Sequence, residues 1–177
     1  FLILSGRYVS PSNTFQTFEG RYEATGFIPQ ELTKSLIRYA GHYEVISGRA
    51  KDRSEAVTKA LTGLNSLESS TTYPLLLALL KLRDEGGLSD HDLSRAVLML
   101  KGFILRRFIC GDSSRGYARI FIRAIAQLAT DPIKSLRSFL INRGWPDDSR
   151  FTGAFVDSPL YQRDYSKHIL ASLERGR

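Results

Sequence analysis

Residues 89–111, SDHDLSRAVLMLKGFILRRFICG, contain the clearest helix signal in the chain. Ser89 is a favourable N-cap residue, and Asp92 follows three positions later in a weaker variant of the capping box. Apolar side chains then recur at helical spacing, and Gly111 suits the left-handed conformation that ends many helices. The apolar stripe consists of Leu93, Val97, Leu100, Ile104 and Phe108.

The segments on both sides of this stretch carry similar start and stop signals. No window shows the sustained apolar/polar alternation of a half-buried strand. The sequence therefore predicts an irregular all-α fold of about eight to nine helices without a significant sheet. Besides the helix in 89–111, helices are expected near residues 13–22, 29–46, 54–68, 72–85, 114–129, 132–143, 148–155 and 163–173, with Thr72 and Asp131 as caps.

The length of 177 residues fits one packed domain. The chain begins at Phe1 in the middle of an apolar pattern, without an initiator Met, so we expect a piece of a longer intracellular protein. No apolar run reaches the length that a membrane span needs, so no membrane partner is expected.

Positive charge is concentrated in residues 101–123, where six basic and one acidic side chain give +5 of the net charge of +7. Such a cluster is typical of contact with a polyanion, although acidic partners elsewhere in the fold would explain it equally well. Arg115, Arg119 and Arg123 are expected to form a row on one face of a helix over residues 114–129. The candidate contacts to DNA phosphates are Lys101, Arg106, Arg115, Arg119 and Arg123.

Arg107 differs from these candidates because its position on the helical wheel lies within the apolar stripe. A guanidinium in that position is costly unless it is paired and hydrogen-bonded. We expect Arg107 to be a structural buried charge whose partner is either an acidic side chain or the carbonyls at a helix C-terminus.

The sequence contains no complete catalytic or metal-binding constellation. His42, His91 and His168 are isolated, and none has a second His or an acidic residue at the spacing of a zinc helix. We expect His42 to be a packing residue, His91 to be exposed, and Cys110 to be a buried structural thiol. No catalytic residue, metal ligand or cofactor is therefore predicted for this chain.

Several short segments together resemble the central helical region of GmrSD-type restriction endonucleases. The resemblance is strongest over residues 70–175, and the run from Arg106 to Gly111 is its most distinctive part. Residues 1–69 match only in their helix–loop–helix rhythm. The matching segments are 73–80 YPLLLALL, 88–90 LSD, 103–111 FILRRFICG, 131–133 DPI, 145–148 WPDD, 159–161 PLY and 169–174 ILASLE.

The resemblance implies a bacterial, cytoplasmic protein that acts in phage defence by cutting modified DNA. In that family a ParB/sulfiredoxin-like domain precedes the helical region and an HNH nuclease domain follows it. A parent protein of this kind would use a nucleoside triphosphate and a divalent metal. The nucleotide-domain and HNH motifs are absent from this chain, so no catalytic residue of the family can be assigned to it.

Three functions remain compatible with the sequence. In the first, residues 1–69 form the leading helices and residues 70–177 the helical core of a non-catalytic interdomain module, which positions the nuclease and contacts DNA phosphates. The second is a protein-interaction or oligomerisation module without a nucleic-acid role. The third, an independent small enzyme, is disfavoured because no catalytic constellation is present. The oligomeric state is not encoded in any recognisable pattern.

Overall fold

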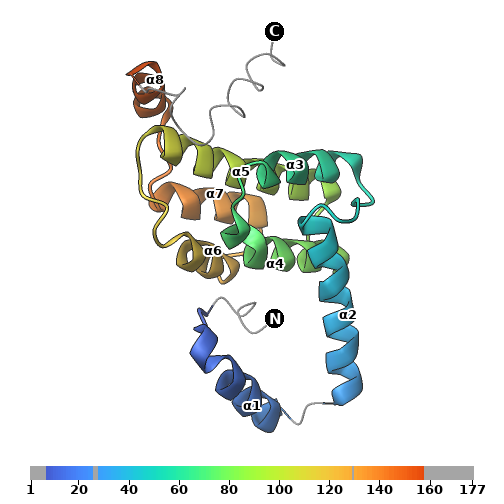
Figure 1. Cartoon of the computed structure of the whole chain (residues 1–177). Coiled ribbons are helices and arrows are strands. Elements are labelled where there is room, and N and C mark those ends of the chain that lie inside the picture. The colour runs from blue at the N-terminus through green and yellow to red at the C-terminus, as the bar shows by residue number, and fades with distance from the viewer. Residues whose placement is uncertain (1–6, 26–27, 129, 158–177) are drawn as a thin grey trace.

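The computed structural model in Figure 1 describes residues 7–25, 28–128 and 130–157. These residues form eight α-helices and two short 3₁₀-helices and contain no strand, which confirms the predicted all-α class. The elements are η2 (Pro11–Asn13), α1 (Thr14–Thr25), α2 (Pro29–Ile46), α3 (Glu55–Asn65), η3 (Ser70–Thr72), α4 (Tyr73–Asp84), α5 (Asp90–Ile109), α6 (Tyr117–Ile125), α7 (Pro132–Asn142) and α8 (Asp148–Asp157).

The starts of α3, α5 and α7 follow from local capping chemistry. The Ser89 hydroxyl oxygen accepts a hydrogen bond from the Asp92 amide at 3.0 Å, and the hydroxyl donates to the Asp92 carboxylate at 2.9 Å. Asp131 Oδ1 accepts from the Lys134 amide at 3.0 Å at the start of α7. These bonds satisfy amides that have no partner within the helix, and they confirm the predicted caps of α5 and α7.

Thr72 does not cap α4 as the sequence predicted. Its backbone is already helical, and its hydroxyl donates to the Ser69 carbonyl at 2.8 Å. Thr72 is the last residue of η3, which leads directly into α4. The helical path therefore begins earlier than the cap signal indicated.

The predicted helix over residues 114–129 is also wrong in its bounds. Gly116 has φ +89°, a left-handed conformation, so α6 begins only at Tyr117. Arg115 lies in the turn before α6, where its amide donates to the Ser113 hydroxyl oxygen at 3.1 Å. The helix expected near residues 163–173 lies outside the described residues.

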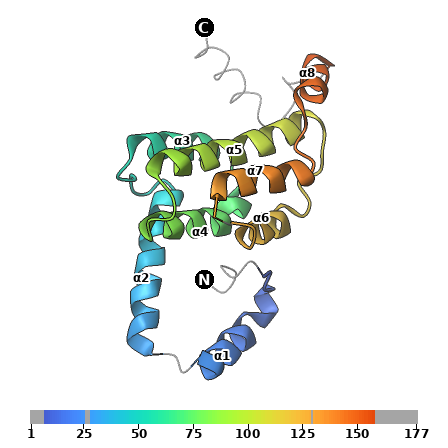
Figure 2. The same ribbon diagram turned by 180° about the vertical axis from the view of Figure 1, so that it is seen from behind.

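Helix α5 lies at the centre of the packing and contacts α3, α4, α7 and α8 (Figures 1 and 2). Its residue Phe103 is fully buried and meets the buried Phe121 of α6 edge-on, with 6.1 Å between ring centroids. The same core includes Val57 and Leu64 of α3. Residues from both sides of position 69 therefore share one hydrophobic core.

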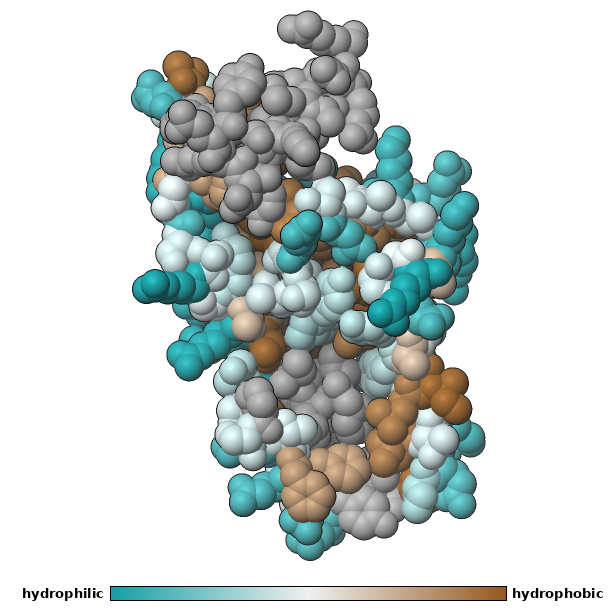
Figure 3. Space-filling view, in the orientation of Figure 1, coloured by the Kyte–Doolittle hydropathy of each residue, from teal (hydrophilic) through white to brown (hydrophobic). Residues whose placement is uncertain are grey.

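Helices α1 and α2 extend away from this core. Only the C-terminal end of α2 lies beside α4, where His42 and Ile46 are buried (Figures 1 and 2). Ile37 in the middle of α2 is 68% exposed and Phe15 of α1 is 71% exposed. Figure 3 shows hydrophobic surface along the part of α2 that points away from the core.

Within the described part of the chain, no helix combines the length and apolar character needed to cross a bilayer.

Candidate nucleic-acid interface

The structure places Arg115, Arg119 and Arg123 on the surface, but not as a row of three along one helix. Arg119 and Arg123 lie on α6, and Arg115 lies in the turn before it. The opposite face of α6 is buried in the core through Phe121 and Ala124. This packing forces the polar face outward, so the two helical guanidiniums project into solvent.

These three arginines have no carboxylate partner among the residues that the structure describes. The guanidinium of Arg119 lies over the Tyr8 ring, 5.6 Å from its centroid. A cation–π contact leaves the guanidinium N–H groups free to donate, because the ring is approached by the face of the cation. The three side chains are therefore available to oxyanions.

Arg106 is not the free cation that the sequence suggested. Its guanidinium lies 2.6 Å from Asp148 Oδ1, donates to the Pro146 carbonyl at 3.1 Å, and stacks over the Phe151 ring at 4.8 Å. These partners come from the segment before α8 and from α8 itself. Arg106 thus ties α8 to α5, and a phosphate could reach it only in competition with Asp148.

Lys101 lies on a different side of α5 from Arg106. It is partly buried along α3, where its ammonium would be 3.3 Å from a Cβ atom placed on Gly63. Helix α6, in contrast, packs against α4 and η3. The structure therefore does not bring Lys101 and Arg106 together with the three exposed arginines around α6.

Arg107 has both kinds of partner that were considered for it. Its Nη1 donates to the carbonyls of Arg143 and Gly144, at 3.0 and 3.1 Å, at the C-terminal end of α7. The side chain is 15% exposed and lies 3.8 Å from Asp112 Oδ2. It also stacks on Phe103, 5.4 Å from the ring centroid. Arg107 thus joins α5 to the end of α7 through a semi-buried charge.

A second buried arginine, Arg83 of α4, was not recognised from the sequence. Its Nη1 donates to both carboxylate oxygens of Asp52 at 2.8 Å, and the two side chains are 7% and 2% exposed. Asp52 also accepts from the Ser54 amide at 2.9 Å, just before α3. The partners are 31 residues apart, so no local pattern indicates this pair.

His42 is buried, as expected, but it has a polar role in addition to packing. Its Nε2 lies 2.8 Å from Asp84 Oδ2 and connects α2 to the end of α4. Burial acts to raise the pKa of Asp84, but the hydrogen bond from His42 and the nearby positive charges outweigh it, so this pKa lies below its ordinary value. The contact fixes the packed end of α2.

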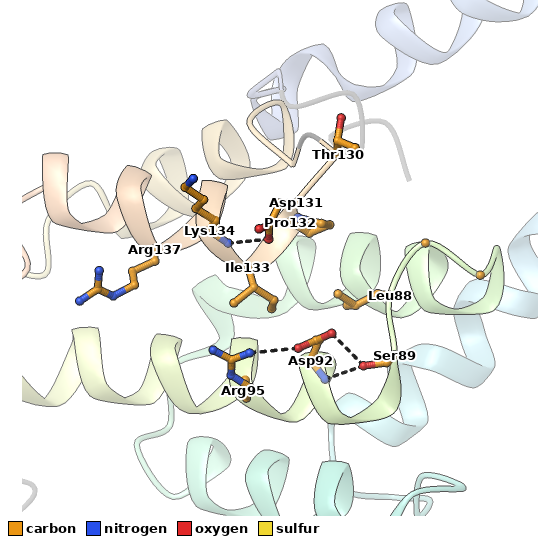
Figure 4. A pocket seen from close by; sticks show the side chains of 12 residues that line it. Leu88, Ser89, Asp92, Arg95, Thr130, Asp131, Pro132, Ile133, Lys134 and Arg137 are labelled. Carbon is orange, nitrogen blue, oxygen red and sulfur yellow. Dashed lines mark hydrogen bonds and ion pairs between the residues drawn. The ribbon is translucent and has the colours of Figure 1, made fainter.

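A cavity that no sequence pattern indicates lies between the N-terminal halves of α5 and α7. It has a volume of about 710 Å³ and is lined by three cationic side chains, Arg95, Lys134 and Arg137. Figure 4 shows Arg95 and Arg137 reaching into the space between the two helices, whereas Lys134 extends away from α5. Arg95 and Arg137 come from distant segments, and neither lies in the basic stretch 101–123.

The structure also places the two remaining residues that the sequence singled out, His91 and Cys110. His91 is exposed, as predicted, whereas Cys110 is only partly buried and is therefore not the buried thiol that was expected. Among the described residues, no group of three or more His, Cys, Asp or Glu side chains is placed to hold a metal ion.

No protein-family model, curated protein sequence or solved structure matches this chain.

Proposed function

We propose that this chain is a non-catalytic helical interdomain module of a GmrSD-type restriction endonuclease in bacterial phage defence, and that it contacts DNA phosphates through Arg115, Arg119 and Arg123. The observation that supports this role is the exposure of the three guanidiniums without a carboxylate partner in the described residues. The family assignment rests on the sequence resemblance alone.

The physical argument concerns unneutralised charge. An arginine that serves stability acquires oxygen partners within the fold, as Arg83 and Arg107 do. Arg115, Arg119 and Arg123 have no such oxygen partners in the described residues, so they do not stabilise the fold in the way that Arg83 and Arg107 do. Because a guanidinium can bind two phosphate oxygens at once, such a group suits the backbone of DNA.

In this proposal the helical module acts as a spacer between catalytic domains of a cytoplasmic parent protein. Nucleotide hydrolysis and DNA cleavage, with a nucleoside triphosphate and a divalent metal, would belong to those flanking domains. The single core that joins α3 to α7 suits a spacer, because it resists bending between its two ends.

The test is fluorescence-anisotropy binding of this chain to a DNA duplex of random sequence, titrated from low to physiological salt. We expect the Arg115→Ala/Arg119→Ala/Arg123→Ala variant to bind at least about tenfold more weakly at low salt. Its salt dependence should fall by about 0.9 logarithmic units for each lost phosphate contact.

The matched control is Arg38→Ala/Arg49→Ala/Lys51→Ala, which removes the same formal charge from exposed positions on and after α2. Equal losses in the two variants would mean that only the net charge attracts DNA, and the proposal for α6 would fail. Absence of binding by the unaltered chain, even at low salt, would also contradict it.

The second candidate function is a protein-interaction or oligomerisation module, and the exposed apolar side chains of α1 and α2 favour it. Phe15, Ile28, Leu36 and Ile37 are 71%, 58%, 47% and 68% exposed. In sedimentation velocity, concentration-dependent self-association that is abolished by Leu36→Ser/Ile37→Ser would support this role.

A further inference from the structure

Helix α8 is attached to the molecule differently from the helices that precede it. The helices from α3 to α7 all bury side chains in the core. None of the residues Asp148–Asp157, all of which the structure describes, is buried. Figures 1 and 2 show α8 at the edge of the molecule, beside the C-terminal end of α5, which is its main packing partner.

The contacts that hold α8 against α5 are ionic and aromatic. Asp148 Oδ1 lies 2.6 Å from Arg106 Nη2, and the Phe151 ring stacks on the same guanidinium. Arg150 donates to both carboxylate oxygens of Asp112, at 3.2 and 2.5 Å. Asp148 is 89% exposed and Arg150 is 49% exposed. Because exposed ion pairs contribute little to stability, α8 can leave α5 at a small cost in free energy.

Arg106 is the cation that α8 neutralises. Its Nη2 is engaged by Asp148 and its Nη1 by the Pro146 carbonyl, and its side chain is 29% exposed. A phosphate would bind the same planar set of N–H donors. Docking of α8 and binding of a phosphate at Arg106 therefore compete.

The charge of the neighbouring surface also depends on α8. A cavity of about 480 Å³ beside Trp145 has four charged side chains in its wall, Arg106, Arg137, Asp147 and Asp148. Their formal charges cancel while α8 is docked, and withdrawal of Asp148 leaves a net charge of +1. Undocking of α8 therefore turns a neutral surface into a cationic one.

We propose that α8 is an autoinhibitory cover for Arg106. Asp148 occupies the guanidinium until a DNA phosphate displaces it, and α8 then leaves α5. This inference rests on the proposed contact with DNA phosphates, and it adds Arg106 as a contact that forms only after α8 has moved. Because the two events exclude one another, each weakens the other by the same factor.

The experiment compares Asp148→Asn with Asp157→Asn in anisotropy titrations with duplex DNA of random sequence at low salt. Both changes remove one negative charge from an exposed position of α8, but Asp157 has no ion pair among the described residues. We expect Asp148→Asn to tighten DNA binding about fivefold, the factor that corresponds to one exposed ion pair. Asp157→Asn should tighten it less than about twofold, through the net charge alone.

Two further variants separate the cover from simple electrostatics. Arg150→Gln removes a positive charge, so net charge alone predicts weaker DNA binding, whereas loss of the pair with Asp112 should release α8 and tighten binding. In an Arg106→Gln background, Asp148→Asn should have no larger effect than Asp157→Asn, because the guanidinium that it uncovers is absent. Circular dichroism verifies that each variant is folded.

Hydrogen exchange measured by mass spectrometry tests whether α8 moves. Addition of duplex DNA should accelerate exchange of the α8 amides and leave those of α7 unchanged. Slower exchange in α8 with DNA would overturn the cover, because α8 would then remain docked in the complex.

The outcomes distinguish this inference from the proposed function. DNA binding by the unaltered chain, with equal effects of Asp148→Asn and Asp157→Asn or with weaker binding by Arg150→Gln, would overturn the cover and leave the proposed DNA contact standing. Absence of DNA binding by both the unaltered chain and Asp148→Asn would overturn both proposals.

Discussion

The basic stretch 101–123 and the α5–α7 cavity use their arginines in different ways. Within the stretch, Arg106 and Arg107 are bound to a carboxylate and to carbonyls of neighbouring segments. The cavity is lined by Arg95 of α5, which lies 3.2 Å from Asp92, and by Arg137 of α7, which has no carboxylate partner in the described part of the chain. The comparison teaches that charge density along a sequence does not measure the charge available on a surface.

The physical reason is the cost of removing a guanidinium from water. When the helix face that carries an arginine meets another element, the charge is desolvated and must acquire oxygen partners. When the face remains in solvent, no such requirement exists. One helix, α5, therefore carries both the semi-buried Arg107 and the solvent-exposed Arg95, and the two types of arginine respond differently to mutation.

The largest effect is expected where a structural arginine is most deeply buried, at Arg83. Asp52→Ala should lower the free energy of unfolding by about 3 kcal/mol, because it leaves Arg83 buried without its bidentate partner. Urea denaturation measures this loss. Asp90→Ala is the control, since Asp90 Oδ1 lies 3.4 Å from the same guanidinium but its side chain is 41% exposed.

Asp90→Ala should cost less than about 1 kcal/mol, as is typical of exposed ion pairs. If Asp52→Ala and Asp90→Ala lowered the free energy of unfolding equally, burial would not determine which ion pairs stabilise this fold.

A smaller effect is expected at Arg107, which is semi-buried. Arg107→Met keeps the apolar stem but leaves the carbonyls of Arg143 and Gly144 without their donor, so it should cost about 2 kcal/mol. The exposed Arg115 provides the contrast, and Arg115→Ala should change the stability by less than about 0.5 kcal/mol. Chemical denaturation of both variants tests the distinction, which would be lost if Arg115→Ala were the more damaging change.

The His42–Asp84 contact should give the smallest effect, because Asp84 is 31% exposed. The pKa of Asp84 is lower in the folded chain than its ordinary value, so its contribution is present above the unfolded pKa and is lost as the pH falls through the folded pKa. Between about pH 5 and pH 2, the unaltered chain should lose about 1 kcal/mol more stability than Asp84→Asn.

Urea midpoints measured across this acidic range test the prediction at Asp84. Glu85→Gln, at the exposed neighbouring position, should retain the full pH dependence of the unaltered chain. If Asp84→Asn lost as much stability in acid as the unaltered chain, the contact to His42 would not contribute to holding α2 against α4.

The errors in the predicted helices arise where one residue's backbone conformation departs from the surrounding pattern. Apolar periodicity continued through residues 114–129, but the left-handed Gly116 delays α6 to Tyr117. Thr72 is a residue type that is favoured at N-caps, but it is instead the last residue of the 3₁₀-helix η3. In both cases the side-chain pattern was compatible with two backbone paths, and the path observed is the one in which η3, α4 and α6 contact one another.

The candidate site was only partly predictable for a related reason. The sequence identified Arg115, Arg119 and Arg123 as basic, and the structure shows them exposed. It gave no sign that Arg106 is paired with Asp148, or that Arg95 and Arg137 share a cavity. These relations depend on how α5 lies against α7 and α8, which no periodicity encodes.

The sequence by itself determined the all-α class and most helix ends, because caps such as Ser89 and Asp131 act through hydrogen bonds only three residues long. Only the tertiary structure decided which charged side chains have oxygen partners within the fold and which are left to solvent. Arg83 pairs with Asp52, which is 31 residues away in the sequence, and His42 pairs with Asp84, which is 42 residues away. Pairing over such separations depends on the packing of whole helices, whereas capping depends on a single turn.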